Sequence, residues 1–183
     1  RGLEAAVAAV QIPEDHERGL RDLANTLGVP VRTLLLSVHL RVLASLCGSR
    51  DVTTGLVSNV RPETADGDRA LGLFLNTLPL RAQMAPGRWR DLVLQVREAE
   101  LGAIEHRYYP YFRLHREQGG EPLFGTICNY VNFHAYDALE NAGLRLLGSR
   151  VHEWTGYPLD VSFSHTGGRL LLQVIVDPAR LSP

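Results

Sequence analysis

Residues 71–81 read Leu71-Gly-Leu-Phe-Leu-Asn76-Thr-Leu-Pro79-Leu-Arg81, and this stretch decides how the rest of the chain is interpreted. The pattern predicts a short strand over residues 77–81. Gly72 is expected to allow a backbone conformation that a side chain would block. Asn76 directly precedes the strand and can cap it through hydrogen bonds to the backbone. The stretch therefore predicts a loop that leads into a strand.

A second strand, over residues 51–60, is predicted on the other side of that loop. The loop contains Arg61-Pro62 and Asp66-Gly67, and it is long enough to be functional. Pro62 and Pro79 are expected to fix the turns on either side. The guanidinium of Arg61 suits a carboxylate or a carbonyl, so we expect it to hold the loop together.

Further out, apolar residues at helical spacing alternate with segments of strand character. Helices are predicted between Pro13 and Gly28, where apolar residues recur at 20, 23, 24 and 27, over 31–46 and over 88–105, and a short one ends at Gly119-Gly120. Further strands are predicted over 7–12, 124–133, 144–154, 159–164 and 169–176, the last two joined as a hairpin at 166–168. This order predicts an α+β fold with a mixed sheet covered by helices.

The composition is that of a folded domain: 183 residues, 45% hydrophobic and 21% charged. All 19 basic residues are arginine, which excludes lysine chemistry such as a Schiff base within this chain. The net charge of −1 argues against a nucleic-acid partner. No apolar run is long enough to span a bilayer, and no leader is visible, so we expect no membrane partner and a cytoplasmic location.

Few residues suggest catalysis. Cys47 and Cys128 lack metal-ligand spacing and are both expected to be buried small hydrophobes. His39, inside an apolar helix, and His165, on a strand, are expected to be packing residues, whereas His134 with Asp137 is a weak candidate for a proton-transfer pair. The serines lack the turn of a serine hydrolase, and no glycine-rich phosphate loop precedes a helix. These observations predict no metal site.

Both ends suggest a piece of a longer protein. The chain begins with Arg1, and residues 181–183 resemble the start of a helix.

Several motifs in order resemble the condensation domains of nonribosomal peptide synthetases, which belong to the chloramphenicol acetyltransferase-like acyltransferases. The most specific is the segment at 71–81, which is close to the family's Gly-x-Phe-x-Asn-Thr-x-Pro-x-Arg. One departure is Val60, which replaces a glycine before Arg61-Pro62, and another is the 117–121 turn, which lacks the usual arginines. The remaining matches are Asp51-Val-Thr-Thr-Gly55, Glu105-His106-Arg-Tyr-Tyr-Pro110, Pro122-Leu-Phe124, Asn129-Tyr130-Val-Asn132 and Trp154-Thr-Gly-Tyr157-Pro158-Leu159.

The resemblance implies the carboxy-terminal lobe of a two-lobed enzyme, with the whole of residues 1–183 in that lobe. The family's His-His-x-x-x-Asp-Gly motif lies in the other lobe, so this chain is expected to hold no catalytic residue and to be inactive alone. The amino-terminal lobe and carrier proteins are the implied partners. No cofactor is expected to bind directly, because phosphopantetheine on the carriers presents the substrates.

The resemblance also implies roles for individual residues. Asn76 lies near the reaction channel in the family, so support of the oxyanion stands beside the strand-capping role. Tyr130 and Asn132 share one strand face and are expected to line the tunnel. Arg61, Pro62, Gly72, Pro79, Arg81, His106 and Pro110 are expected to be structural, with His106 bonding the helix break before Pro110.

The implied reaction is amide formation between an acyl or peptidyl thioester and an acceptor amine. Two alternatives remain open. The chain is also compatible with a condensation-like module that recruits partner proteins, and with an ester-forming acyltransferase of the same superfamily.

Overall fold

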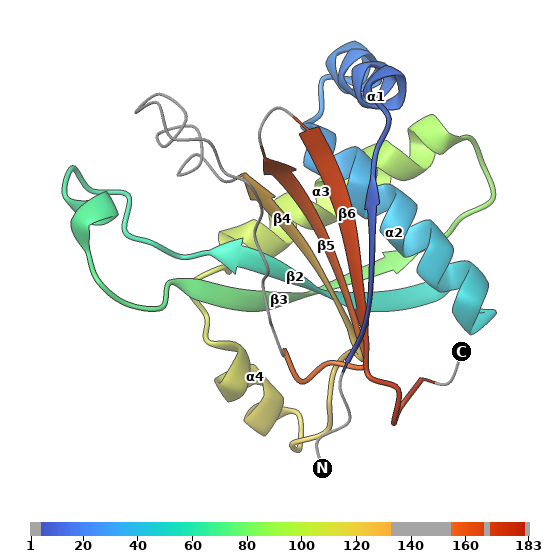
Figure 1. Cartoon of the computed structure of the whole chain (residues 1–183). Helices are drawn as coiled ribbons and strands as arrows, with labels where there is room; N and C mark the ends of the chain where they lie inside the picture. Colours follow the sequence, from blue (N-terminus) through green and yellow to red (C-terminus); the bar gives the residue numbers. More distant parts are fainter. Residues whose placement is uncertain (1–4, 133–154, 167–168, 182–183) are drawn as a thin grey trace.

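The structure is a computed structural model that describes residues 5–132, 155–166 and 169–181 (Figure 1). Within these ranges, strands and helices alternate in the first two thirds of the chain and strands follow. The strands are β1 (Ala6–Gln11), β2 (Asp51–Asn59), β3 (Leu75–Gln83), β4 (Thr126–Asn132), β5 (Leu159–Thr166) and β6 (Arg169–Val176). The helices are α1 (Glu14–Leu27), α2 (Val31–Cys47), α3 (Trp89–Glu105), α4 (Tyr111–Glu117) and the 3-10 turn η1 (Gly67–Arg69).

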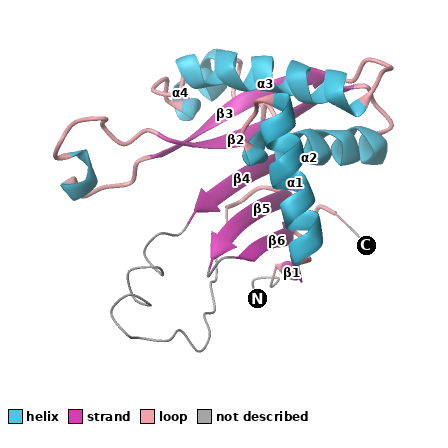
Figure 2. Cartoon of the chain, turned by 90° about the horizontal axis from the view of Figure 1, so that it is seen from above, coloured by secondary structure: helices cyan, strands magenta, loops and turns pink. Residues whose placement is uncertain are grey.

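The strands form one mixed sheet in the order β1-β6-β5-β4-β2-β3. The β2–β4 and β4–β5 pairs are parallel, and the remaining pairs are antiparallel. Helices α1, α2 and α3 lie along one side of the sheet (Figures 1 and 2). The predicted α+β fold, a mixed sheet covered by helices, is therefore confirmed.

The core lies between this helix layer and the sheet. Leu40 of α2, Leu80 of β3 and Val96 of α3 are completely or almost completely buried there. Because α2 is apolar around most of its circumference, it buries residues against both the sheet and its neighbouring helices. Burial of this apolar surface is the main favourable term for the fold.

Glycines end the first two helices. Gly28 and Gly48 both adopt the left-handed conformation just after α1 and α2, where a residue with a Cβ would be strained. The first helix begins at Glu14, directly after the predicted break at Pro13, and its acidic first turn suits the positive end of the helix dipole.

The strands predicted within the described residues were right in position and differed in length. The strand expected over 77–81 is β3, which begins two residues earlier and pairs along its whole length with β2. The strand predicted over 144–154, like His134 and Asp137, lies outside the described residues.

An aromatic cluster packs against the other face of the sheet. The ring of Phe124 lies directly against Gly55, where a methyl group would overlap it. Tyr157 stacks on the same ring with its centroid 5.5 Å from that of Phe124, and Tyr111 of α4 packs on it at a tilt with a centroid distance of 5.1 Å. Gly55 is therefore required by a close approach, and the cluster anchors α4 beside β3.

No single helix in the described ranges is long and apolar enough to cross a membrane, although α1 and α2, bent by 104° at their junction, satisfy the length and composition test as a pair.

Candidate functional site

Asn76 joins β3 to the turn between α3 and α4. Its Nδ2 donates to the backbone carbonyls of Arg107 at 2.8 Å and Tyr109 at 2.7 Å, and its Oδ1 accepts from the N–H of Tyr111 at 3.1 Å. Pro110 interrupts the helix here, so these backbone groups lack helical partners. The side chain of Asn76 supplies the missing hydrogen-bond partners.

This arrangement differs from the strand-capping role expected for Asn76, because the side chain caps a distant turn and not its own strand. An amide has only two N–H donors, and both are used. An oxyanion would have to displace the carbonyl of Arg107 or Tyr109. The geometry favours a positioning role, and transition-state support stays a prediction.

A polar hollow of about 330 Å³ opens where β2 and β4 end beneath α2 and α3. We call it the sheet-end hollow. Tyr130 and the buried Cys128 form its wall on β4, and Ser58 lies at the end of β2. Arg107 at its rim donates to Glu63 and to the hydroxyl of Tyr108 at 3.0 Å. The hollow thus combines apolar walls with hydroxyl groups and a tethered guanidinium.

Glu100 of α3 lines this hollow, and its carboxylate is only 1% exposed. Arg32 Nε lies 2.7 Å from one oxygen, while Arg97 Nη1 at 3.2 Å and the hydroxyl of Thr33 at 2.6 Å donate to the other. A buried carboxylate needs such partners because its desolvation is costly. The cluster ties α2 to α3 beside the hollow.

The loop between β2 and β3, residues 60–74, projects from the body as an arm (Figure 1). Arg61 Nη1 donates to the carbonyls of Gly67 at 2.9 Å and Ala70 at 2.7 Å, and its guanidinium lies 4.5 Å from the centre of the Phe74 ring. Gly72 has a φ of +148°, which favours glycine. Arg61 therefore holds the arm through carbonyls, one of the two expected modes.

The other motif residues occupy structural positions. Arg81 pairs with Asp51 across β2 and β3, and Pro79 lies opposite Gly55 in the same ladder. The carbonyl of Pro62 packs directly on Gly67 within the arm. The carbonyl of His106 accepts the N–H of Tyr109 at 2.9 Å, so its backbone bonds the turn before Pro110.

The tunnel-lining prediction concerns β4. Tyr130 lines the sheet-end hollow beside Phe163, its register partner on β5. The backbone of Asn132 pairs with that of His165 two residues further along, and the tunnel-lining role of Asn132 stays a prediction.

His39 and the two cysteines test the expectations for buried groups. His39 is buried and its Nε2 lies 3.0 Å from Thr54 Oγ1, which in turn donates to the carbonyl of Thr126. Burial lowers the pKa of His39 to about 4 and raises the pKa of Cys128 to about 12, so both are neutral near pH 7. Cys47 is exposed, and the prediction of burial was wrong there because it ends α2.

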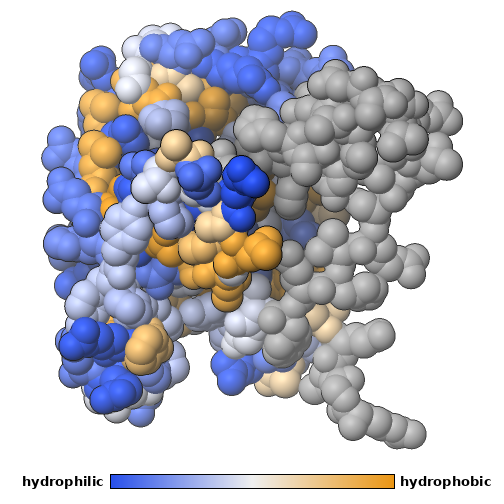
Figure 3. Space-filling model, turned by 90° about the vertical axis from the view of Figure 1, so that its left-hand side faces the viewer, coloured by the Kyte–Doolittle hydropathy of each residue, from blue (hydrophilic) through white to orange (hydrophobic). Residues whose placement is uncertain are grey.

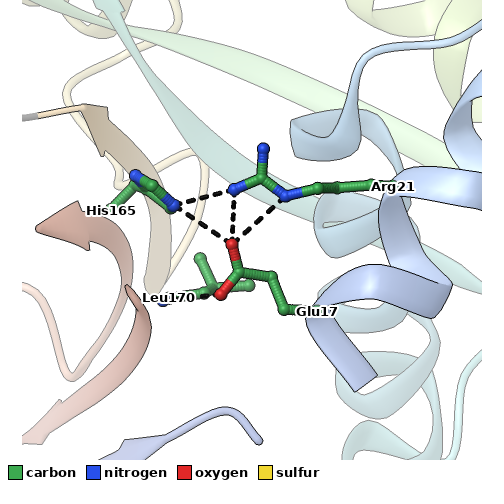
Figure 4. Close-up of polar contacts among 4 residues, drawn as sticks. All are labelled: Glu17, Arg21, His165 and Leu170. Carbon is green, nitrogen blue, oxygen red and sulfur yellow. Dashed lines mark hydrogen bonds and ion pairs between the residues drawn. The ribbon is translucent and has the colours of Figure 1, made fainter. Parts of the chain in front are cut away.

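A polar cluster that the sequence analysis missed joins α1 to the β5–β6 hairpin (Figure 4). One carboxylate oxygen of the buried Glu17 accepts the N–H of Leu170 at 3.1 Å. The other oxygen accepts a hydrogen bond from Arg21 and lies 3.1 Å from His165 Nε2. Burial raises the pKa of Glu17, but these bonds outweigh it and the net pKa is lowered. His165 therefore does more than pack. Only its separation of 148 residues from Glu17 hid the pairing.

No group of three or more histidine, cysteine or acidic residues capable of holding a metal occurs in the described ranges.

The chain matches the family model of the condensation domain over residues 1–176 and therefore belongs to the condensation domain family. It is 39% identical over 170 residues to the AMB antimetabolite synthetase AmbE of Pseudomonas aeruginosa, covering 90% of this chain and 8% of that protein. It is also 34% identical over 134 residues to tyrocidine synthase 2 of Brevibacillus parabrevis, covering 68% of this chain and 4% of that synthase.

Solved structures agree on the fold. The condensation domain from the monacolin K polyketide synthase MokA superposes with a TM-score of 0.86 at 20% identity, over 98% of this chain and 43% of that chain. The first condensation domain of the calcium-dependent antibiotic synthetase, solved with a substrate analogue, gives 0.77 at 21% identity, over 100% of this chain and 42% of that one. The chain thus spans less than half of each solved protein.

Proposed function

We propose that the chain is the carboxy-terminal lobe of a condensing enzyme that forms an amide bond between a carrier-bound acyl or peptidyl thioester and an acceptor amine in nonribosomal peptide biosynthesis. One observation carries the proposal: the condensation family match extends over residues 1–176, yet the chain covers only 43% of a solved condensation domain. The remainder of such a domain is the other lobe.

The projecting arm supports a contact with that lobe. Leu71 is 98% exposed and Leu73 is 85% exposed, although Arg61 and Gly72 hold the arm in a defined conformation. Hydrophobic atoms gather on the face from which the arm projects (Figure 3). An ordered arm that presents leucines to solvent is typical of an interaction surface. The amino-terminal lobe is the partner we propose for it.

In this proposal the sheet-end hollow is the part of the substrate channel that this lobe contributes. Tyr130 and Ser58 offer hydroxyl groups beside the apolar wall of Phe163, which suits a substrate that is partly apolar and partly polar. Asn76 and the Glu100 cluster hold the elements around the hollow. The proton-transfer residue is assigned to the other lobe, and the carriers deliver substrates on phosphopantetheine in the cytoplasm.

The test is a condensation assay on the gene product that contains this chain. A carrier loaded with an aminoacyl thioester and a carrier loaded with the acceptor amine are mixed with the protein, and the dipeptidyl carrier is detected by intact mass. We expect product with the gene product and none with residues 1–183 alone. Product formation by residues 1–183 alone would overturn the assignment of one lobe.

The same assay separates the two other functions. An ester bond breaks in mild alkali whereas an amide survives, so a labile product identifies an ester-forming acyltransferase. A recruiting module gives no product but retains a partner synthetase on a column. The departure at residues 117–121 from the family's arginine-rich turn is the feature that favours this last possibility.

A further inference from the structure

A second hollow lies at the opposite end of the α2–α3 pair. It has a volume of about 390 Å³, within the range of roughly 300–1,000 Å³ usual for small-molecule sites. Arg41 comes from α2, Arg50 from the turn before β2, and Arg88 with Trp89 from the start of α3. We call it the arginine hollow.

The three arginines have no carboxylate partner among the residues that the structure describes. The two nearest acids along the chain are already engaged. Asp51 pairs with Arg81, and Asp91 accepts the backbone N–H of Arg88 at 3.1 Å. The remaining side chains around the hollow, such as Met84 and Leu92, are uncharged. All three arginines are exposed, so their guanidinium groups give the hollow a positive charge that attracts anions and leaves the groups accessible to a ligand.

The chemistry of the lining narrows the class of anion. A planar carboxylate is satisfied by one guanidinium fork, whereas a tetrahedral phosphoryl group offers oxygens to several forks at once. The hollow also lies at the first turn of the 17-residue helix α3, where the helix dipole favours negative charge. Asp91 already accepts the N–H of Arg88 in this turn, so we assign the anion to the three guanidinium groups and not to the backbone. Trp89 is 58% exposed at the edge and offers a flat apolar surface to the rest of a ligand.

We propose that the arginine hollow binds the phosphoryl group of a small phosphate or pyrophosphate ester. The site is separate from the sheet-end hollow, so its ligand does not compete with a substrate held there. The proposal is independent of the condensation reaction, because it rests only on the lining residues.

The test is calorimetric titration of the full 183-residue chain with inorganic pyrophosphate at constant ionic strength. We expect saturable binding at one site per chain. Arg41→Gln and Arg88→Gln should each weaken it by about 10-fold or more, the usual loss when a hydrogen bond to a charged group is removed. Arg90→Gln is the matched control, since Arg90 lies next to Trp89 but does not line the hollow, and it should change affinity by less than about 2-fold.

Trp89 provides a second readout. Pyrophosphate should alter the tryptophan fluorescence of the wild-type chain, and Trp89→Phe should abolish that change while Trp154 remains. Succinate tests carboxylate recognition and should bind at least about 10-fold more weakly than pyrophosphate. The proposal fails if no saturation occurs by about 10 mM pyrophosphate, if Arg90→Gln weakens binding as much as Arg88→Gln, or if succinate binds equally well.

Discussion

The two hollows at opposite ends of α2 and α3 are both lined by arginine, and they differ in what the arginines contact. In the sheet-end hollow, Arg32 and Arg107 pair with Glu100 and Glu63. In the arginine hollow, the guanidinium groups of Arg41 and Arg88 have no acidic partner among the described residues. The same residue type thus serves two purposes within one helix pair.

The difference shows that burial decides which arginines hold the fold together and which are free to bind a ligand. A carboxylate as buried as Glu100 is stable only with its partners, so its arginines are committed to the fold. Exposed guanidinium groups are hydrated and need no partner for folding, so they remain able to bind one. Four predictions test this contrast, from the largest expected effect to the smallest.

Glu100→Ala should lower the free energy of unfolding by about 3–5 kcal/mol, because it leaves Thr33 and two arginines without their shared acceptor in a buried site. Urea titration followed by circular dichroism measures this. Glu98→Ala is the control, since Glu98 is exposed on the same helix. Equal losses in the two variants would show that Glu100 is no more structural than a surface residue.

Asn76→Ala should lower the free energy of unfolding by about 2–3 kcal/mol, since two carbonyls and one N–H of the α3–α4 turn lose their partner. Hydrogen exchange should speed up at the N–H of Tyr111, which Asn76 accepts. Asn25→Ala, on an exposed position of α1, should leave both quantities unchanged within about 0.5 kcal/mol. Unchanged exchange at Tyr111 would contradict the positioning role.

Because of the buried His39, which lies on α2 between the two hollows, we expect the free energy of unfolding to depend on pH. Its folded pKa of about 4 lies below the 6.5 of an exposed imidazole, so between these pH values the unfolded chain binds a proton that the folded chain excludes. Stability therefore falls as the pH drops through this window, by about 2 kcal/mol between pH 7 and pH 5.

His39→Gln removes this contribution and keeps a donor for Thr54. Denaturant titrations at pH 7 and pH 5 should show a smaller pH-dependent loss in the variant than in the wild-type chain. Identical losses would place the responsible proton on another group.

Arg41→Gln should change the free energy of unfolding by less than about 0.5 kcal/mol, since its guanidinium has no partner among the described residues. Arg97→Gln is the matched comparison, because it removes a bond to the buried Glu100 and should cost more. If Arg41→Gln lowered the free energy of unfolding more than Arg97→Gln, the arginines of the arginine hollow would be the structural ones, which contradicts the proposed difference between the hollows.

Much of the fold was predictable, because the spacing of apolar residues and the glycines and prolines that end helices and strands are local features of the sequence. The helix over residues 31–46 was placed almost completely by apolar spacing. The structural roles of Arg61 and Gly72 also followed from their chemistry. The first helix was expected after Pro13 without a stated first residue, since its polar first turn carries no apolar pattern.

The site was less predictable, because its contacts join residues far apart in the sequence. Asn76 was placed next to its own strand, yet it bonds backbone groups 31 and 33 residues away. His165 was interpreted as a packing residue, although Glu17 lies 148 residues before it. No local pattern encodes such pairs, because they depend on where the sheet brings the segments together.

The sequence by itself determined the helices and strands, the α+β class and membership of the condensation family, since these depend on local spacing and ordered motifs. Only the tertiary structure decided which arginines are paired and which line an open hollow. The reason is physical: every arginine carries the same charge, and the distance to a carboxylate and the burial of that carboxylate are set by the packing of α2, α3 and the sheet.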